Sequence, residues 1–516
     1  MPRPALHVPR NSTPVESATV DRSAPGLPGF ARRALALPAD TYALWALAAL
    51  CVLAVVGFFT WVTYPNYDSY YALLWGEELL DGNLPSFEAY RAPTEHPLAI
   101  VFGAALSVLG QDADRVMVLI TLFAFVALVA GTYKLGRTVF SPFVGAIAAF
   151  LVLTRFDFPS LAVRAYLDIP FMAAIVWAGA LEAARPRRGT PVFLLLAGAG
   201  LLRPEAWILS GVYFLWMSWD AGWNQRFRYA ALTAIGPLGW AATDFIVTGD
   251  PLFSLTSTQD LAAELDRTRS GGDILSALPE YLRGTVKTPV YFAGLIGLAI
   301  AVWKFPLRTI VPLMLFLAGA FTFVATGLVG LSVIVRYLLV PSVMLTLFAG
   351  VTLGGWTMVP RGTRLRRAWA IGAAVVTVAG LAYTAYRPPS LERFNNELSF
   401  RGEQGQSLHR LLETSAVERA LRCGAVSVPT HKLIPDTRWV LGLGDADVVA
   451  RSDPSDASAR KARYGVAIFP VGRTNILRTG FAVNTDAITQ VPGRGFRRIA
   501  TEKYFAAYVR CPAGRA

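Results

Sequence analysis

Long apolar runs that alternate with short basic clusters are the feature that most constrains this chain. A helix needs about 20 apolar residues to cross a bilayer, and runs of this kind recur as far as residue 386. Only 16% of the residues are charged, whereas soluble domains carry about 25%, which argues against a soluble enzyme. The basic clusters between the runs are Lys134 to Arg137, Arg185 to Arg188, Arg226 to Arg228, Lys304 to Arg308 and Arg361 to Arg367. This placement is typical of the positive-inside rule of multi-pass membrane proteins, so the net charge of +13 does not indicate a nucleic-acid partner.

The apolar runs predict a polytopic α-helical membrane protein. We expect spans near residues 43–63, 115–134, 138–155, 169–184, 229–248, 289–303, 309–328, 337–356 and 368–386. The run 97–110 is short for a crossing and is expected to enter the membrane and return. The run 191–218 is broken by Arg203-Pro204-Glu205 and is expected to form two short helices. If 97–110 returns to the side from which it entered and 191–218 crosses twice, the basic clusters all fall on the inner side. The chain then crosses the membrane about eleven times.

The polar segments predict the domain organisation. Residues 1–42 are expected to be a disordered cytoplasmic tail with no secretory signal, and residues 43–386 to be the transmembrane domain. The first outer loop, 64–96, carries six acidic residues and one arginine, and a second large loop covers 249–288. Residues 387–516 are expected to form a small extracytoplasmic α/β domain. Its predicted elements are a helix over Gln406 to Arg422 and strands at Gly424 to Pro429, Tyr464 to Pro470 and Tyr504 to Val509.

The few cysteines and histidines limit the chemistry. Cys51 falls inside an apolar run and is expected to be a core residue. Cys423 and Cys511 would be able to pair if the C-terminal domain faces an oxidising compartment, and the sequence leaves this pairing open. The four histidines are scattered and make no zinc site.

Three carboxylates on the predicted outer side are the first candidates for chemistry: Asp68, Glu95 and Asp168. They come from distant parts of the sequence to one side of the membrane, where one could act as a base and the others could orient an acceptor. Each has a structural alternative. Asp68 could cap the helix that follows, Glu95 could mark the polar entry to a helix, and Asp168 could pair with Arg164 one turn away.

Two arginines in apolar surroundings are the basic counterparts, Arg203 and Arg336, with Arg164 as a third. A guanidinium there is suited to bidentate binding of a phosphate leaving group. The alternatives are that Arg203 pairs with Glu205 and that Arg336 extends to the membrane interface.

Further candidates lie in the loops and in the C-terminal domain. Asp250 could belong to a lid over an acceptor groove or could cap an ordinary loop, and His96 and Glu205 are candidates on the acceptor side. His431, Asp436 and Trp439 could bind a sugar, with stacking on Trp439, or could fill and cap a small domain.

The order of these motifs resembles the membrane-embedded glycosyltransferases of the C superfamily. The motifs are Asp68 after the first span, Glu95-His96-Pro97, Tyr166-Leu167-Asp168-Ile169-Pro170 and Arg336-Tyr337-Leu338. They are similar to those of the lipid-A aminoarabinose transferases and protein O-mannosyltransferases over residues 43–356. Two positions depart from these families. Arg203 stands where the aminoarabinose transferases have Lys, and Ser69 follows Asp68 in place of a second acid.

The resemblance implies an inverting transferase that moves a sugar from a polyprenyl-phosphate donor to an acceptor hydroxyl of a lipid, polysaccharide or protein. It would place the acceptor-activating role on Asp68, with Glu95 and Asp168 lining the same cavity and Arg203 and Arg336 approaching the lipid phosphate. A transporter of lipid-linked sugars and an inactive scaffold are the alternatives. No cofactor is certain and a divalent cation stays open. The expected location is the plasma membrane, with the N-terminus cytoplasmic.

Overall fold

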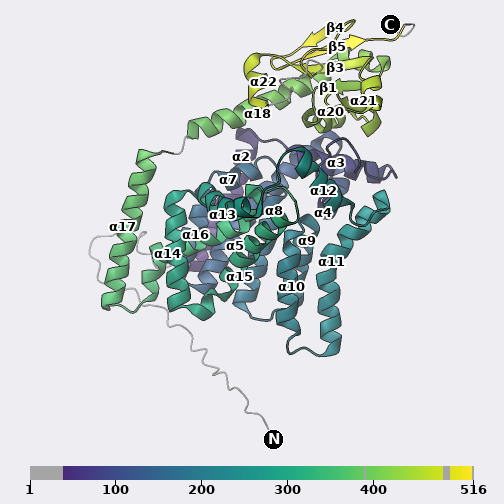
Figure 1. Cartoon of the computed structure of the whole chain (residues 1–516). Coiled ribbons are helices and arrows are strands. Elements are labelled where there is room, and N and C mark those ends of the chain that lie inside the picture. The colour runs from purple at the N-terminus through teal and green to yellow at the C-terminus, as the bar shows by residue number, and fades with distance from the viewer. Residues whose placement is uncertain (1–38, 389–390, 480–488, 514–516) are drawn as a thin grey trace. The chain divides into compact units, whose positions relative to one another are not determined.

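The computed structural model describes residues 39–388, 391–479 and 489–513, and these are mostly helical (Figure 1). The predicted tail 1–42 lies outside the described residues except for its last four, which begin helix α2. Within these described ranges, six helical stretches are long and apolar enough to cross a membrane: Asp40–Thr60, Gly110–Val139, Trp223–Thr248, Pro306–Leu328, Val335–Met358 and Arg364–Tyr386. A seventh span is formed if Gly271–Val286 and Thr288–Lys304, which meet at 112°, are one broken crossing.

Every predicted apolar run is a helix in the structure. The helices of the membrane domain are α2 (Ala39–Thr60), α4 (Pro97–Ser107), α5 (Ala113–Val139), α6 (Pro142–Thr154), α8 (Asp168–Ala184), α9 (Thr190–Leu202), α10 (Glu205–Ser218), α11 (Trp223–Thr248), α14 (Thr288–Lys304), α15 (Pro306–Leu328), α16 (Leu339–Gly354) and α17 (Arg364–Tyr386). The break at Arg203-Pro204 separates α9 from α10, as the proline predicts. The helical class is confirmed, while the number of eleven crossings stays a prediction.

Helix α16 forms the centre of the membrane domain. Of the 18 most apolar consecutive residues in Val335–Met358, 94% are buried inside the protein. Glycines let neighbouring helices approach it closely. A Cβ atom on Gly297 of α14 would lie 1.8 Å from the carbonyl oxygen of Phe348, and one on Gly350 would lie 2.8 Å from that of Val144 in α6. This close packing makes a rigid base for the loops that follow.

The segment 64–96, which the sequence predicts as the first outer loop, contains helix α3 (Tyr67–Leu80). Residues 69–76 of α3 are all buried, and α3 packs directly on α4. Gly76 and Gly103 allow this contact: a Cβ atom on Gly103 would lie 1.9 Å from the carbonyl oxygen of Ala72. The short helix α4 therefore supports α3, whose N-terminus carries Asp68.

Other short helices cover the same end of the membrane domain. The loop 249–288, expected to be a lid or an ordinary loop, forms α12 (Phe253–Glu264) and α13 (Gly271–Val286). Ile274 and Leu282 of α13 are buried in a hydrophobic cluster with α15 and α16. Helix α7 (Asp157–Ala162) precedes α8, and the 3-10 turn η1 (Gly110–Asp112) precedes α5. The 3-10 turns η2 (Val335–Leu338) and η3 (Gly355–Met358) lie at the two opposite ends of α16.

The C-terminal region is an α/β domain, as predicted, built on a five-stranded sheet of order β2-β1-β3-β5-β4. The strands are β1 (Val426–Val428), β2 (Val448–Ala450), β3 (Gly465–Pro470), β4 (Arg497–Thr501) and β5 (Phe505–Arg510). Strands β1, β2 and β3 are parallel, and β5 runs antiparallel to β3 and β4. The helices are α18 (Leu391–Leu412), α19 (Ser415–Ala420), α20 (Ile434–Leu441), α21 (Asp456–Lys461) and α22 (Arg473–Thr479), with the 3-10 turns η4 (Leu421–Cys423), η5 (His431–Leu433) and η6 (Asp445–Asp447).

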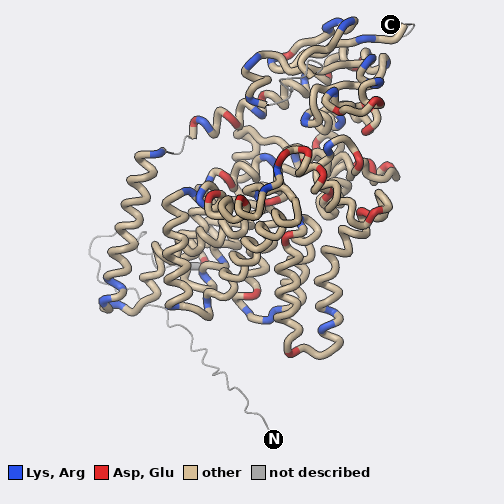
Figure 2. The backbone as a smooth tube through the Cα atoms, in the orientation of Figure 1, with Lys and Arg blue, Asp and Glu red and all other residues tan. Residues whose placement is uncertain are grey.

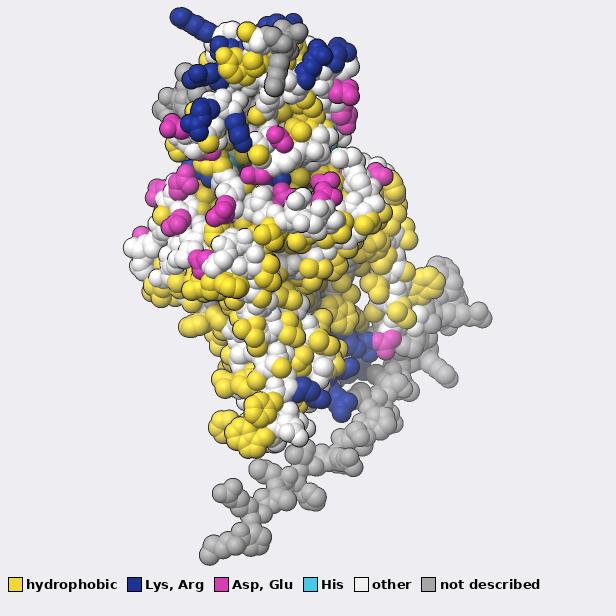
Figure 3. Space-filling view, turned by 90° about the vertical axis from the view of Figure 1, so that its right-hand side faces the viewer, with side chains coloured by type: hydrophobic (Ala, Val, Ile, Leu, Met, Phe, Trp, Pro, Cys, Tyr) yellow, Lys and Arg dark blue, Asp and Glu magenta, His cyan; other side chains and the backbone are white. Residues whose placement is uncertain are grey.

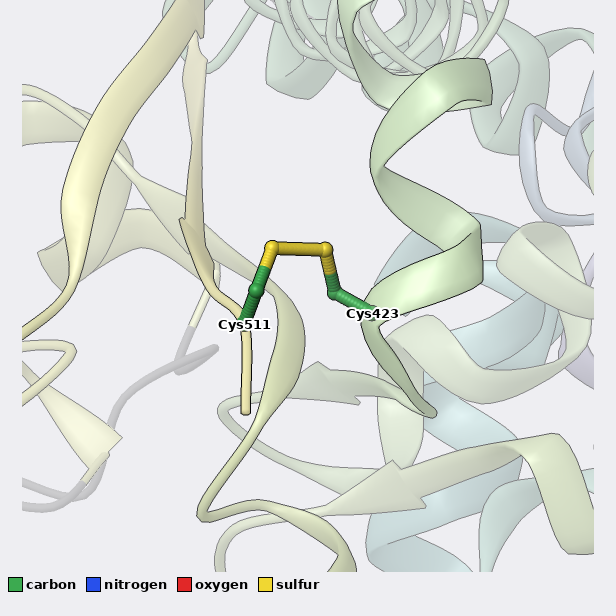
Figure 4. The surroundings of a disulfide bond; sticks show 2 residues. All are labelled: Cys423 and Cys511. Atoms are coloured by element: carbon green, nitrogen blue, oxygen red, sulfur yellow. A yellow bond between two sulfur atoms is a disulfide. The ribbon is translucent and has the colours of Figure 1, made fainter. Parts of the chain in front are cut away.

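The cysteine pairing that the sequence left open is present: Cys423 and Cys511 form a disulfide (Figure 4). It joins the end of η4 to the residue after β5, 88 positions later in the chain. Cys51 is a free cysteine in α2, but it is half-buried, so the prediction that it is a core residue is wrong. A disulfide of this kind is typical of a domain that folds in an oxidising compartment.

Polar contacts between described residues hold the C-terminal domain to the membrane domain. The guanidinium of Arg438, 1% exposed, lies 2.5 Å from the carboxylate of Glu78. The hydroxyl of Tyr90 donates to the carbonyl oxygen of Ser452 (2.9 Å). Gln111 donates to the carbonyl oxygen of Trp439, also over 2.9 Å. A buried charged pair is costly to break when only one partner is removed, so these contacts fix the domain over α3.

The charges are distributed unevenly along the molecule. Basic residues gather at the end of the spanning helices that lies away from the C-terminal domain, and acidic residues gather where the two regions meet (Figure 2). Between them the surface of the helical region is largely apolar (Figure 3). A band of this kind is what a membrane-spanning protein presents to lipid.

Candidate active site

Asn66 caps the N-terminus of α3 and so determines where Asp68 lies. The side-chain oxygen of Asn66 accepts hydrogen bonds from the backbone N–H groups of Asp68 (2.8 Å) and Ser69 (3.4 Å). Its amide nitrogen donates to the carbonyl oxygen of Arg164 (2.9 Å), which ties α3 to the segment before α8. The alternative in which Asp68 is the helix cap is therefore wrong, and Asp68 lines a cavity instead.

Asp168 is the first residue of α8 and is completely buried. Its carboxylate pairs with the guanidinium of Arg203, which ends α9. Arg203 also pairs with Glu205 at the start of α10, over 2.6 Å. The predicted Arg203–Glu205 pair is thus present, but as one half of a larger arrangement in which Arg203 is held between two carboxylates.

Arg336 connects Asp168 to Asp68. One guanidinium nitrogen, Nη1, lies 3.2 Å from Asp68 Oδ2 and 3.4 Å from Asp168 Oδ2. The guanidinium also lies over the ring of Tyr166, 5.3 Å from its centroid. The alternative in which Arg336 extends to the membrane interface is wrong, because its charge is used within this cluster. Its side chain keeps 34% exposure, whereas that of Arg203 keeps 7%, so Arg336 is the more accessible guanidinium.

Arg164 lies beside the cluster but not in a pair with Asp168 along one helix, as the sequence alternative proposed. Helix α7 ends at Ala162 and α8 begins at Asp168, so the two residues are not on a common helix. Instead, Arg164 donates to the carbonyl oxygen of Ser160 (2.8 Å) and lies over the ring of Tyr166 at 5.0 Å. Arg164 therefore lies near the cluster, and no carboxylate in the described part of the chain forms an ion pair with it.

The cluster is closely balanced in charge. Asp68, Asp168 and Glu205 supply three negative charges against the two positive charges of Arg203 and Arg336. The cluster carries one net negative charge with all five groups ionised. The guanidinium of Arg336 lines the cavity and is accessible to a bound anion.

A cavity of about 1550 Å³ extends from this cluster. One wall is apolar and comes from α11, through Pro237, Leu238 and Ala241. Another part of the wall comes from the C-terminal domain, through His431 and Lys432. A ligand with an apolar tail and a polar head matches a cavity of this composition.

Among the described residues, neither Glu95 nor Asp250 forms an ion pair with a member of the Asp68 cluster. Glu95 is 2% exposed, and burial raises its pKa to about 8. Its neighbours are Ser254 of α12 and Asp244 of α11, and Asp244 accepts hydrogen bonds from both the backbone and the hydroxyl of Ser254. Asp250 is exposed and accepts from the backbone N–H of Leu252 (2.9 Å), as the capping alternative predicts.

His96 and the C-terminal candidates fall into two groups. His96, at the start of α4, lines the cavity and lies against Trp240, with ring centroids 5.6 Å apart. His431 and Asp436 line the cavity as well. Trp439 is only 3% exposed and packs beside Tyr70 of α3, so its alternative as a packing residue is confirmed and no sugar can stack on it.

The structure adds cavity residues that the sequence reasoning did not select. They are Tyr337, whose ring lies 5.3 Å from the Arg203 guanidinium, and Asp244, Arg267 and Lys432. Tyr337 had a signal in the sequence, since it follows Arg336 in the quoted motif, whereas Arg267 and Lys432 sit in polar segments with none. Within the described ranges no group of three or more His, Cys, Asp or Glu side chains could hold a metal ion.

The fold of this helical chain is similar to that of ArnT, an aminoarabinose transferase, and so agrees, at the level of the fold, with the resemblance found in the sequence. No family model matches the chain, and no curated protein is similar to it in sequence. The structure is similar to that of ArnT from Cupriavidus metallidurans bound to undecaprenyl phosphate. The TM-score is 0.55 at 13% identity, over 92% of this chain and 99% of that one.

Two further solved structures are similar. ArnT in the apo state gives a TM-score of 0.54 at 12% identity, over 91% of this chain and 98% of that one. The Archaeoglobus fulgidus oligosaccharyltransferase gives a TM-score of 0.47 at 14% identity, over 90% of this chain and 74% of that one.

Proposed function

We propose that this protein is an inverting glycosyltransferase that moves a sugar from a polyprenyl-phosphate donor to an acceptor hydroxyl. The observation that carries the proposal is the pairing of Asp68, Asp168 and Arg336 at one end of a cavity with both an apolar and a polar wall. The likeness of the fold to ArnT, which was solved with undecaprenyl phosphate bound, supports a donor of this class.

The proposed reaction takes place at the outer face of the plasma membrane. The disulfide and the acidic residues near the C-terminal domain support an outer location for that end, and the basic clusters at the other end support a cytoplasmic one. In this topology residues 43–386 cross about eleven times, and residues 387–516 form an extracytoplasmic domain. A donor held by its lipid tail is the suitable sugar source there, because nucleotide sugars are cytoplasmic.

The step begins with the acceptor oxygen. Asp68 takes the hydroxyl proton as that oxygen attacks the anomeric carbon from the side opposite the phosphate. The bond between the anomeric carbon and the phosphate oxygen breaks, and its electron pair leaves with the polyprenyl phosphate. Arg336, with Arg164 nearby, stabilises the charge that grows on the phosphate. Arg203 acts as a positioning residue, because its two carboxylate partners already neutralise it.

Substitution of Asp68 tests the proposal directly. Asp68→Asn is expected to lower turnover by about 10²- to 10⁴-fold, because general-base catalysis contributes that much. The assay follows release of free polyprenyl phosphate, by mass spectrometry, from a panel of polyprenyl-phosphate sugars added to the purified protein in detergent. Asp81→Asn, at the exposed other end of α3, is the matched control and is expected to keep wild-type turnover.

Other outcomes separate the alternatives. A well-folded Asp68→Asn protein with wild-type turnover would contradict the role of Asp68. Tight binding of a donor without release, in both the wild type and the variant, would instead favour a transporter or a scaffold.

A further inference from the structure

A second cavity, with a volume of about 310 Å³, lies between helices α14 and α17. Ile296 and Ile300 of α14 form one apolar wall, and Leu365 and Ala368 of α17 form the other. Gly372 of α17 also lines this space, and a Cβ atom added to it would meet no atom within 4 Å. Among the described residues, none lines both this cavity and the one at the candidate active site. We call this open space between two helices the α14–α17 groove.

Helix α17 leaves most of its surface to the membrane. Of the 18 most apolar consecutive residues in Arg364–Tyr386, 6% are buried inside the protein. The indole nitrogen of Trp369 donates to the carbonyl oxygen of Thr352 in α16 (2.9 Å). Nearer the other end of α17, the hydroxyl of Tyr383 lies 3.4 Å from that of Thr288, the first residue of α14. An apolar space offers water few hydrogen bonds, so a lipid chain is the occupant that fits the groove.

Basic residues without carboxylate partners lie at one end of the groove. Lys304 lines the groove at the end of α14. Arg364 is exposed and is the first residue of α17, one helical turn before Ala368. The sequence contains no Asp or Glu over residues 281–391, which include both helices. In the described part of the chain neither Lys304 nor Arg364 forms an ion pair, so this end of the groove has a positive charge that is not neutralised locally.

The start of α17 adds to this positive potential. Its first turn carries Arg366 and Arg367 as well as Arg364. The N-terminal end of a helix is itself positive, so these side chains reinforce the helix dipole. A phosphate group beside this turn would be stabilised by both the side chains and the dipole.

We propose that the α14–α17 groove binds an anionic phospholipid. One acyl chain lies along Gly372, and the phosphate group lies between Lys304 and Arg364. The indole of Trp303, 69% exposed, lies beside the ammonium group of Lys304, 3.5 Å from its ring centroid, and exposed tryptophans are typical of the headgroup level. Basic pockets between spanning helices bind anionic headgroups in this way.

The lipid comes from the leaflet at the end of the helices that lies away from the C-terminal domain, where basic residues gather (Figure 2). This site is independent of the proposed function, because it uses none of the residues of the candidate active site. It therefore stands or falls without regard to the transfer reaction.

The test measures lipid binding to the full-length protein in detergent by native mass spectrometry. Phosphatidylglycerol and phosphatidylcholine with the same acyl chains differ in net charge, and glycerol 1-phosphate carries the anion without the chains. We expect phosphatidylglycerol to bind about tenfold or more tightly than phosphatidylcholine, because two basic residues near an anionic lipid contribute that much. Glycerol 1-phosphate at the same concentration is expected not to displace it.

Variants separate the headgroup from the chain. The double variant Lys304→Gln and Arg364→Gln is expected to lose the preference for phosphatidylglycerol. Gly372→Leu fills the groove and is expected to weaken the binding of both phospholipids. Arg228→Gln, in the first turns of α11, is the control for charge. Gly211→Leu in α10, where an added Cβ atom meets nothing within 4 Å, is the control for bulk. Both controls are expected to bind as the wild type does.

Four outcomes would overturn the site, in variants that elute as folded monodisperse species. The first is equal binding of the two phospholipids, and the second is an unchanged preference in the double variant. Unchanged binding in Gly372→Leu, or displacement by glycerol 1-phosphate, would show that the charged surface binds the headgroup without the groove. A dimer without bound lipid in the same spectra would show that a second copy of the chain covers the groove instead.

Discussion

At the scale of single residues, the site depends on charges that neutralise one another in a poorly hydrated place. Asp168 is completely buried and pairs with Arg203 and Arg336 at once. Removing one member of such a group leaves the others without a counter-charge, which costs more than the group gains by forming. Asp168 is therefore expected to be essential to the fold as well as to the site.

Asp168→Asn is expected to lower the free energy of unfolding by about 3–5 kcal/mol, because two guanidinium groups lose their shared carboxylate. The measurement is unfolding in mixed micelles with increasing denaturing detergent. Asp220→Asn removes an exposed pair with Arg187 and is expected to change stability by less than about 1 kcal/mol. Equal effects of the two substitutions would contradict the buried network.

The pH dependence of stability gives a second prediction, from Asp436. Burial raises its pKa to about 7, whereas the unfolded value is about 3.9. The folded protein thus binds this proton more tightly than the unfolded chain does. The proton on Asp436 therefore stabilises the folded state below about pH 4. This stabilisation falls as the pH rises towards about 7 and is lost above that.

Asp436→Asn has no titrating carboxyl group at this position. We expect its stability to depend less on pH than that of the wild type, and to be higher at pH 8. Thermal unfolding between pH 4 and pH 8 measures this dependence. Asp447→Asn, an exposed change in the same domain, should follow the wild-type curve. Identical slopes for Asp436→Asn and the wild type would show that this carboxyl group is not the cause.

At the scale of helices, the sequence predicted the apolar elements well and the short polar ones poorly. Pro204 alone placed the break between α9 and α10. The sequence analysis had a helix after Asp68 only as the alternative in which Asp68 caps it. The extent and burial of α3 were not predicted, since its buried face is shorter than a crossing and acidic residues follow that face. The sequence analysis placed Asp68, Asp168 and Arg336 on the same side of the membrane, and it was this that predicted their proximity. The contacts of Glu95 were not predicted. Its neighbours Ser254 and Asp244 belong to helices α12 and α11, and no local sequence pattern shows how these helices pack.

The close contact of α3 with α4 gives a prediction for Gly103. Gly103→Ala would force the two backbones apart, since the new methyl group would overlap the carbonyl oxygen of Ala72. We expect a loss of about 1–3 kcal/mol in stability and a lower turnover, because α3 carries Asp68. Gly211→Ala in α10 meets no atom within 4 Å and is the control. It is expected to be neutral or slightly stabilising. Wild-type stability and turnover in Gly103→Ala would show that this helix contact does not position Asp68.

At the scale of the whole molecule, the C-terminal domain completes the cavity and is held by its disulfide. Closing an 88-residue separation removes much of the freedom of the unfolded domain. Paired substitution of Cys423 and Cys511 by Ser is expected to cost about 2–5 kcal/mol. Thermal unfolding of this domain with and without reductant measures it. The reductant should shift the wild type and leave the double variant unchanged, and a shift in both would mean that the reductant acts elsewhere.

The position of β5 in the sheet has a consequence for how the protein is made. This strand lies between β3 and β4, yet it follows every other strand in the chain. Its first residue, Phe505, lines the cavity. During synthesis and export the spanning helices are inserted first, and the sheet cannot close until β5 has crossed to the outer side. In the proposed topology the cavity is therefore completed only after translocation, so under the proposed function a chain that is still being inserted does not yet act on its donor.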